Sequence, residues 1–167
     1  MKSNFIRNNI WRIVSVILCV LCVGFIFGNS LDNAARSSNK SGAVVAVLQG
    51  VVDVFSDDVT VNEDFVRTAA HFTEFLLLGF LLLLTVRTFT QKYMQNVFVA
   101  LFTALAVAVI DEILQMFSDG RVADVADVVV DFSGAVTGML IFILIEFVRR
   151  RVKVGGKKQT KTKEMVR

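Results

Sequence analysis

Residues 97–117 read VFVALFTALAVAVIDEILQMF, and apolar side chains dominate this stretch. An α-helix rises about 1.5 Å per residue, so about 20 residues cross the hydrocarbon core of a bilayer, which is about 30 Å thick. The run is therefore expected to span a membrane. Near its end it carries Asp111, Glu112 and Gln115. Ionisable groups inside a span are costly and usually serve a function.

Three further apolar runs of similar length cover residues 10–28, 69–86 and 125–147. The hydrophobic fraction is 54% and the mean hydropathy is +0.63, whereas soluble domains are about 45–50% apolar. A cleaved signal peptide is the alternative for the first run, but no small-residue cleavage site follows it. The apolar stretch 42–55 is too short to span. The sequence thus predicts an all-α membrane protein, a four-transmembrane-helix bundle with a short interfacial or re-entrant helix in the first outer loop.

Charge is distributed unevenly along the chain, and this predicts an orientation. Residues 149–167 hold nine of the 18 Lys and Arg residues and a single acid. Basic residues also flank the first span and the 87–92 loop. Because basic loops stay in the cytoplasm, we expect a cytoplasmic N-terminus (1–9), a transmembrane domain (10–148) and a basic cytoplasmic tail (149–167) in the bacterial cytoplasmic membrane. The tail either contacts anionic lipid headgroups or only sets topology. Nucleic acid is not expected as a partner, since no folded basic surface accompanies the tail.

Three of the predicted spans carry polar residues at helical spacing. Residues three, four or seven apart share a helix face, and this relates Arg67, His71 and Glu74, then Asp111, Glu112 and Gln115, then Asp124, Asp127 and Asp131. With the expected orientation, Glu74, Asp111 and Asp131 lie roughly 10 Å inside the outer ends of their helices. The spacing therefore predicts one polar pocket that faces the outside.

The charges of this pocket do not balance. Arg67, Arg121 and His71 face six acids, and so many carboxylates in a low dielectric cannot all stay ionised without compensation. Protonation, a bound metal cation or a water-filled vestibule would each provide it. Histidine with carboxylates can ligate zinc, and oxygen-rich sites suit magnesium, calcium or manganese. The candidate metal ligands are His71, Glu74, Asp111, Asp127 and Asp131. Ion pairs that only hold the bundle together are the structural alternative, although six acids exceed that need.

Two smaller signals concern helix packing. Gly134 and Gly138 form a small-x-x-x-small pattern that predicts close contact between helices of this chain. Glu146, near the inner end of the last span, is expected to pair with Arg149 or Arg150.

The polar residues occur in an ordered pattern. It reads Arg67-x3-His71-Phe72-x-Glu74-Phe75-x3-Gly79, then Asp111-Glu112-x2-Gln115, then Gly120-Arg121-x2-Asp124-x2-Asp127-x3-Asp131-x2-Gly134-x3-Gly138. In order and spacing it resembles the VanZ-like family of bacterial membrane proteins over about residues 24–145. That resemblance implies a small integral membrane protein of the cell envelope, since the namesake is associated with resistance to lipoglycopeptide antibiotics such as teicoplanin. Phe75 stands where the family usually carries a tyrosine, so that hydroxyl is missing.

Three functions fit these residues. The first is a protein that binds an amphiphile at the outer face, such as a lipid-linked wall precursor or a lipoglycopeptide, among membrane lipids. Its ligand-binding candidates are Arg67, His71, Glu74, Glu112, Gln115, Arg121, Asp124, Asp127 and Asp131. The second is a membrane-embedded hydrolase or transferase, with or without a metal, acting on a lipid-linked headgroup. Its catalytic candidates are His71, as general base or metal ligand, and Glu74, Asp111 and Glu112. An ion-coupled transporter is the third, disfavoured because four spans contain no evident inverted repeat.

Overall fold

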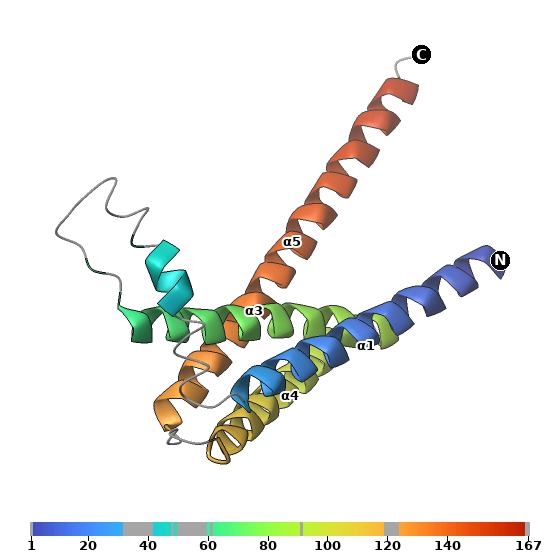
Figure 1. Cartoon of the computed structure of the whole chain (residues 1–167). Coiled ribbons are helices and arrows are strands. Elements are labelled where there is room, and N and C mark those ends of the chain that lie inside the picture. Colours follow the sequence, from blue (N-terminus) through green and yellow to red (C-terminus); the bar gives the residue numbers. More distant parts are fainter. Residues whose placement is uncertain are drawn as a thin grey trace.

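The computed structural model describes residues 2–31, 42–47, 49, 60, 62–90, 92–118 and 124–165, with side chains from residue 9 to residue 152. The elements within these ranges are helices: α1 (Lys2–Ser30), a short helix over residues 42–47, α3 (Glu63–Phe89), α4 (Tyr93–Gln115) and α5 (Val125–Met165) (Figure 1). Each long helix contains a segment apolar and long enough to cross a membrane, namely Asn9–Ser30, Glu63–Phe89, Tyr93–Gln115 and Val125–Val152. The predicted four-helix fold is confirmed, and so is the short helix.

The polar residues that precede the helices fix where they begin. Asn62 caps α3, because its side-chain oxygen accepts a hydrogen bond from the backbone N–H of Asp64 at 2.8 Å. Asp124 does the same for α5, accepting from the N–H of Ala126 at 2.8 Å. Such caps satisfy N–H groups that have no partner within the helix. At its other end, α5 continues to Met165, so the helix includes most of the segment 149–167 that was expected to be a tail.

α3 is the central helix, since its contacts with α5, α1 and α4 are the most extensive in the bundle, and the contact with α5 is the largest of these (Figure 1). Three glycines allow this contact. A Cβ on Gly138 would collide with the carbonyl oxygen of Leu76, and one on Gly79 would collide with the backbone of Ala135. A Cβ on Gly134 would collide with the carbonyl oxygen of Phe72 in α3. The predicted small-residue contact is therefore an internal one, and it holds α3 and α5 backbone to backbone.

The core between the helices is apolar and mostly small or aliphatic. Phe75, Leu78 and Leu83 of α3 are fully buried against alanines of α4 and α5. Many large apolar side chains on the outer surfaces are exposed, for example Phe98 and Phe102 on α4. An exposed apolar surface of this kind is what helices present to lipid.

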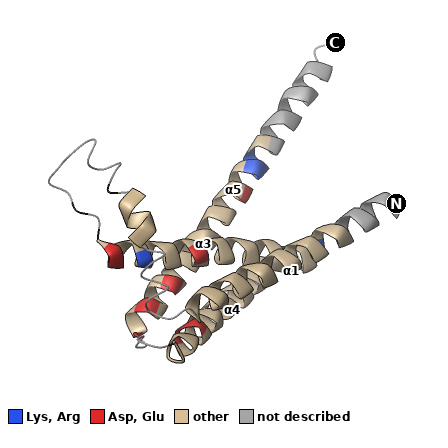
Figure 2. Ribbon diagram, in the orientation of Figure 1, with Lys and Arg blue, Asp and Glu red and all other residues tan. Residues whose placement is uncertain are grey.

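Charged residues separate to the two ends of this core. One end, which we call the basic end, carries Arg12, Arg87 and Arg150. The Nε of Arg12 donates to the carbonyl oxygen of Thr88 at 2.9 Å, and Glu146 pairs with both Arg87 and Arg150. Most described acids gather at the opposite end, where α4 stops and where α3 and α5 begin (Figure 2). We call this the acidic end.

Candidate functional site

At the acidic end, three helices each contribute one side chain to a single centre. His71 of α3, Asp111 of α4 and Asp131 of α5 bring one nitrogen or oxygen atom each to within 4.8 Å of one another. Nδ1 of His71 lies 3.9 Å from Oδ1 of Asp131. Both aspartates are buried and His71 is half-buried. The glycine contact between α3 and α5 is what lets two of these side chains meet across the helices.

Asp111 is held in place by donors from its own helix and from α1. Ser30 Oγ donates to Oδ1 at 2.5 Å, and Gln115 Nε2 donates to Oδ2 at 3.1 Å. The hydroxyl of Ser118 in turn donates to the carbonyl oxygen of Ser30 at 2.9 Å. Hydrogen bonds to a charged group are about twice as strong as neutral ones. The end of α1 is therefore fastened to the carboxylate of Asp111.

Two glutamates flank the centre and are oriented by other helices. Glu112 accepts a hydrogen bond from the backbone N–H of Asp124, directly before α5, at 2.5 Å. Glu74 accepts from Asn29 Nδ2 of α1 at 2.9 Å. Each acid is thus positioned by a neighbouring helix, which makes the cluster an arrangement of the whole bundle.

The electrostatics of the centre are unfavourable as it stands. Asp131 is 1% exposed, and within the described part of the chain neither of its carboxylate oxygens has a hydrogen-bond partner. Four other carboxylates are close enough to repel charge on Asp131, those of Asp111, Asp127, Glu112 and Glu74. A buried polar group without partners is costly, and it usually marks a site that needs a proton, a water or an ion.

Not every predicted site residue lies in this cluster. Arg67 is exposed on the first turns of α3, where its guanidinium pairs with Asp64 at 3.3 Å. Asp124 and Asp127 are exposed at the start of α5, and Asp124 serves as the cap. Arg121 lies outside the described residues. The structure therefore unites His71, Glu74, Asp111, Glu112, Gln115 and Asp131.

Asn29 and Ser30 also belong to the candidate site, although neither is part of the polar pattern in the sequence. They reach Glu74 and Asp111, which follow 45 and 81 positions later. The feature of the sequence that could have identified them is their position. They directly follow the first apolar run, at the same end of the bundle as the buried acids.

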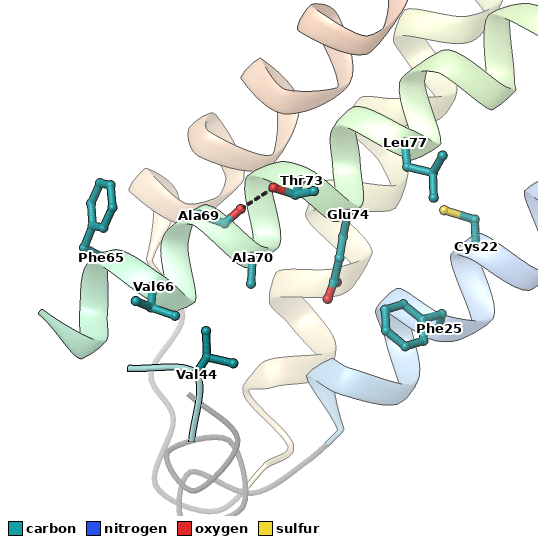
Figure 3. A pocket seen from close by; sticks show the side chains of 10 residues that line it. All are labelled: Cys22, Phe25, Val44, Phe65, Val66, Ala69, Ala70, Thr73, Glu74 and Leu77. Atoms are coloured by element: carbon teal, nitrogen blue, oxygen red, sulfur yellow. Dashed lines mark hydrogen bonds between the residues drawn. The ribbon is translucent and has the colours of Figure 1, made fainter. Parts of the chain in front are cut away.

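A pocket of about 590 Å³ opens beside the cluster. Its walls are Cys22 and Phe25 of α1, Val44 of the short helix and a face of α3 that runs from Phe65 to Leu77 (Figure 3). Glu74 supplies the only charged group among the described lining residues, and it extends from α3 toward the α1 side of the space (Figure 3). The pocket therefore joins an apolar wall to one member of the acidic cluster.

Comparison with known proteins identifies the family. The VanZ/LLP1 family model matches residues 15–146, which include the site and most of every span. The chain belongs to the VanZ/LLP1 family. It is accordingly a multi-pass membrane protein of that family. No curated protein and no solved structure matches it.

The pattern that resembles VanZ-like proteins separates into two groups of residues. Gly79, Gly134 and Gly138 form the close contact between α3 and α5. His71, Asp111 and Asp131 form the buried centre. Phe75, at the position where VanZ-like proteins usually carry tyrosine, is fully buried in the apolar core. One group of VanZ residues thus brings the helices together, and the other places ionisable groups where they meet.

Proposed function

We propose that this VanZ-family protein binds an amphiphilic molecule of the bacterial cell envelope. The observation that carries the proposal is the apolar pocket of about 590 Å³ that borders the acidic cluster through Glu74. Ligand sites are typically apolar cavities of about 300–1,000 Å³ with a few placed polar groups. The apolar wall suits a hydrocarbon chain, and the cluster beyond it suits a polar headgroup.

The ligand class we favour is a lipid-linked wall precursor or a lipoglycopeptide of the teicoplanin type. Both combine a hydrocarbon chain with a polar head, as the pocket and cluster require. The resemblance to VanZ-like proteins supports the same setting. Membrane lipids are the natural competitors for the pocket, because its walls are apolar and belong to α1 and α3, which are long and apolar enough to span a membrane.

The orientation we propose places both termini in the cytoplasm and the acidic end toward the exterior. Its support is the gathering of Arg12, Arg87 and Arg150 at the basic end, since basic residues are retained on the cytoplasmic side. Glu63→Cys and Gln95→Cys test it in a background with Cys19 and Cys22 replaced by alanine. A membrane-impermeant maleimide should label Glu63→Cys in intact cells and Gln95→Cys only after permeabilisation. The reverse pattern contradicts the orientation.

Binding is tested on the purified full chain with two probes, teicoplanin and farnesyl phosphate, measured separately. Ala70 lines the pocket, so Ala70→Trp fills it and should weaken binding of the true ligand class at least tenfold. Ala106→Trp is the matched control, because Ala106 is exposed on α4 and does not line the pocket. Equal affinity in the wild type and both variants would rule out the pocket, and so would failure of both probes to bind.

The cluster supports a second candidate function, hydrolysis or transfer at a lipid-linked phosphate. His71 would act as general base on water, with Asp111, Glu112 or Glu74 as its partners. With farnesyl diphosphate, water would attack the terminal phosphorus and the bridging P–O bond would break, releasing farnesyl phosphate and inorganic phosphate. Phosphate release that His71→Ala abolishes would favour this function over binding alone. No release with any divalent metal added would reject it.

A further inference from the structure

Asp131 is the residue from which the inference starts. It is almost completely buried, and in the described part of the chain neither carboxylate oxygen accepts a hydrogen bond. Oδ1 nevertheless points at Nδ1 of His71, at 3.9 Å. This distance is too long for a hydrogen bond, yet two atoms so separated both reach one ion with bonds of about 2.0–2.2 Å.

Asp111 completes the geometry. Its ligand oxygen lies within 4.8 Å of those of His71 and Asp131, so side-chain shifts of less than about 1 Å would bring all three atoms within bonding distance of one ion. Its two oxygens already accept from Ser30 and Gln115. A carboxylate oxygen has two lone pairs, and metal-ligating carboxylates are typically held by such outer hydrogen bonds.

We propose that His71, Asp111 and Asp131 bind one divalent transition-metal ion, with zinc as the reference ion. An imidazole with two carboxylates suits zinc or manganese better than calcium or magnesium, which take oxygen ligands. Three protein ligands leave a coordination position open for an oxygen of a ligand. The cation also offsets the repulsion among the surrounding carboxylates.

The ion gives the amphiphile site its headgroup preference, and this part of the inference rests on the proposed function. An acidic cluster alone repels phosphate, and Arg67 pairs with Asp64 at the surface. A bound divalent cation neutralises the two aspartates that hold it and offers a phosphate oxygen a positively charged partner. Phosphate-bearing amphiphiles should therefore bind more tightly when the ion is present, while the corresponding alcohols should not.

The first experiment measures zinc alone. The purified full chain is stripped with a chelator and titrated with zinc chloride, and one ion per chain is expected. Asp131→Asn keeps the side-chain volume and should weaken zinc at least tenfold, because even outer-shell changes cost 10–100-fold. Asp127→Asn, on the exposed first turn of the same helix, should change the affinity less than threefold. Equal losses in the two variants would reveal diffuse attraction and overturn the site, and so would absence of zinc binding to the wild type.

A second pair of variants guards against misfolding. His71→Ala should lose zinc, whereas His71→Cys should recover most of the affinity, because thiolate is a zinc ligand. Zinc should also raise the melting temperature of the wild type and of His71→Cys, but not that of His71→Ala. If His71→Ala and His71→Cys bind zinc equally, His71 is not a ligand and the site is wrong.

The third experiment separates this inference from the proposed function. Zinc should tighten farnesyl phosphate binding at least tenfold and leave farnesol unchanged. Ala70→Trp should lose both amphiphiles and keep zinc. Amphiphile binding that ignores zinc overturns the cation's role and leaves the pocket standing. Zinc binding without any amphiphile binding refutes the pocket and leaves the metal site standing.

Discussion

The two ends of the bundle treat charge in opposite ways. At the basic end, Glu146 lies between Arg87 and Arg150, and Arg12 donates to a backbone carbonyl, so each of these charges has a defined partner. At the acidic end, four carboxylates lie close enough to Asp131 to repel its charge, and the basic side chain beside it is His71, whose Nδ1 lies 3.9 Å from Oδ1. The paired charges of the basic end can be explained by their contribution to the stability of the fold. An excess of negative charge inside a membrane bundle is what we expect of a site that binds a compensating group such as a cation.

The largest effect should come from the glycine contact that joins the two ends. Gly138→Ala places a Cβ against the backbone of Leu76, and overpacking of this kind costs about 3 kcal/mol. Gly24→Ala is the control, because nothing lies near a Cβ at that position and alanine favours a helix. Unfolding by SDS titration in mixed micelles measures both. Similar stabilities for the two variants would show that the contact is looser than described.

At the basic end, removal of one charge should destabilise the protein. Glu146→Leu leaves Arg87, which is 12% exposed, without its partner, and should lower the free energy of unfolding by about 2 kcal/mol. Arg150 is 68% exposed, so Arg150→Leu should change it by less than about 0.5 kcal/mol. The same titration compares the two. A negligible effect of Glu146→Leu would remove the contrast between the ends.

The attachment of α1 to the acidic end is the next in size. Ser30→Ala removes the hydroxyl that donates to Asp111, and should cost about 1.5 kcal/mol. Ser133→Ala serves as control, since that exposed hydroxyl bonds only within α5, to the carbonyl of Val130. When thermal unfolding is measured in detergent, the midpoint temperature should be lower for Ser30→Ala and unchanged for Ser133→Ala. An unchanged midpoint would mean that α1 is held without this bond.

The smallest expected effect is a stabilisation rather than a destabilisation, and it tests the contrast between the two ends of the bundle most directly. In the presence of a chelator, Asp131→Asn should raise the free energy of unfolding by about 1 kcal/mol, because it removes a repelled, unbonded charge. Saturating zinc should reverse the order of wild type and variant. Destabilisation by Asp131→Asn with chelator present would show that the acidic end is balanced within the fold.

The sequence predicted what depends on local periodicity. Run length identified the four spans, and the spacing of Gly134 and Gly138 predicted the close helix contact. The pairing of Glu146 with Arg150, four residues away, was also expected and is confirmed. Helical periodicity fixes such relations within one element before any tertiary contact forms.

Contacts between residues far apart in the chain could not be predicted from helical spacing. Arg87 also pairs with Glu146, and Ser30 reaches Asp111, because the bundle sets these neighbours. Spacing grouped Arg67 with His71 and Glu74. In the structure, the guanidinium of Arg67 instead forms an ion pair at the surface with Asp64, three residues earlier in the chain. Depth along a span could be estimated from the helical rise, whereas the direction of a flexible side chain could not.

The backbone contact of α3 with α5 has a mechanical consequence for the pocket. Helices joined through glycines have no side-chain layer between them that can slide or compress, so α3 cannot tilt without taking α5 with it. The opposite wall consists of α1 and residues 42–47, which line the pocket with larger side chains such as Phe25 and Val44. We therefore expect a ligand wider than this space to displace the wall formed by α1 and residues 42–47, which requires the hydrogen bonds of Asn29 and Ser30 to break.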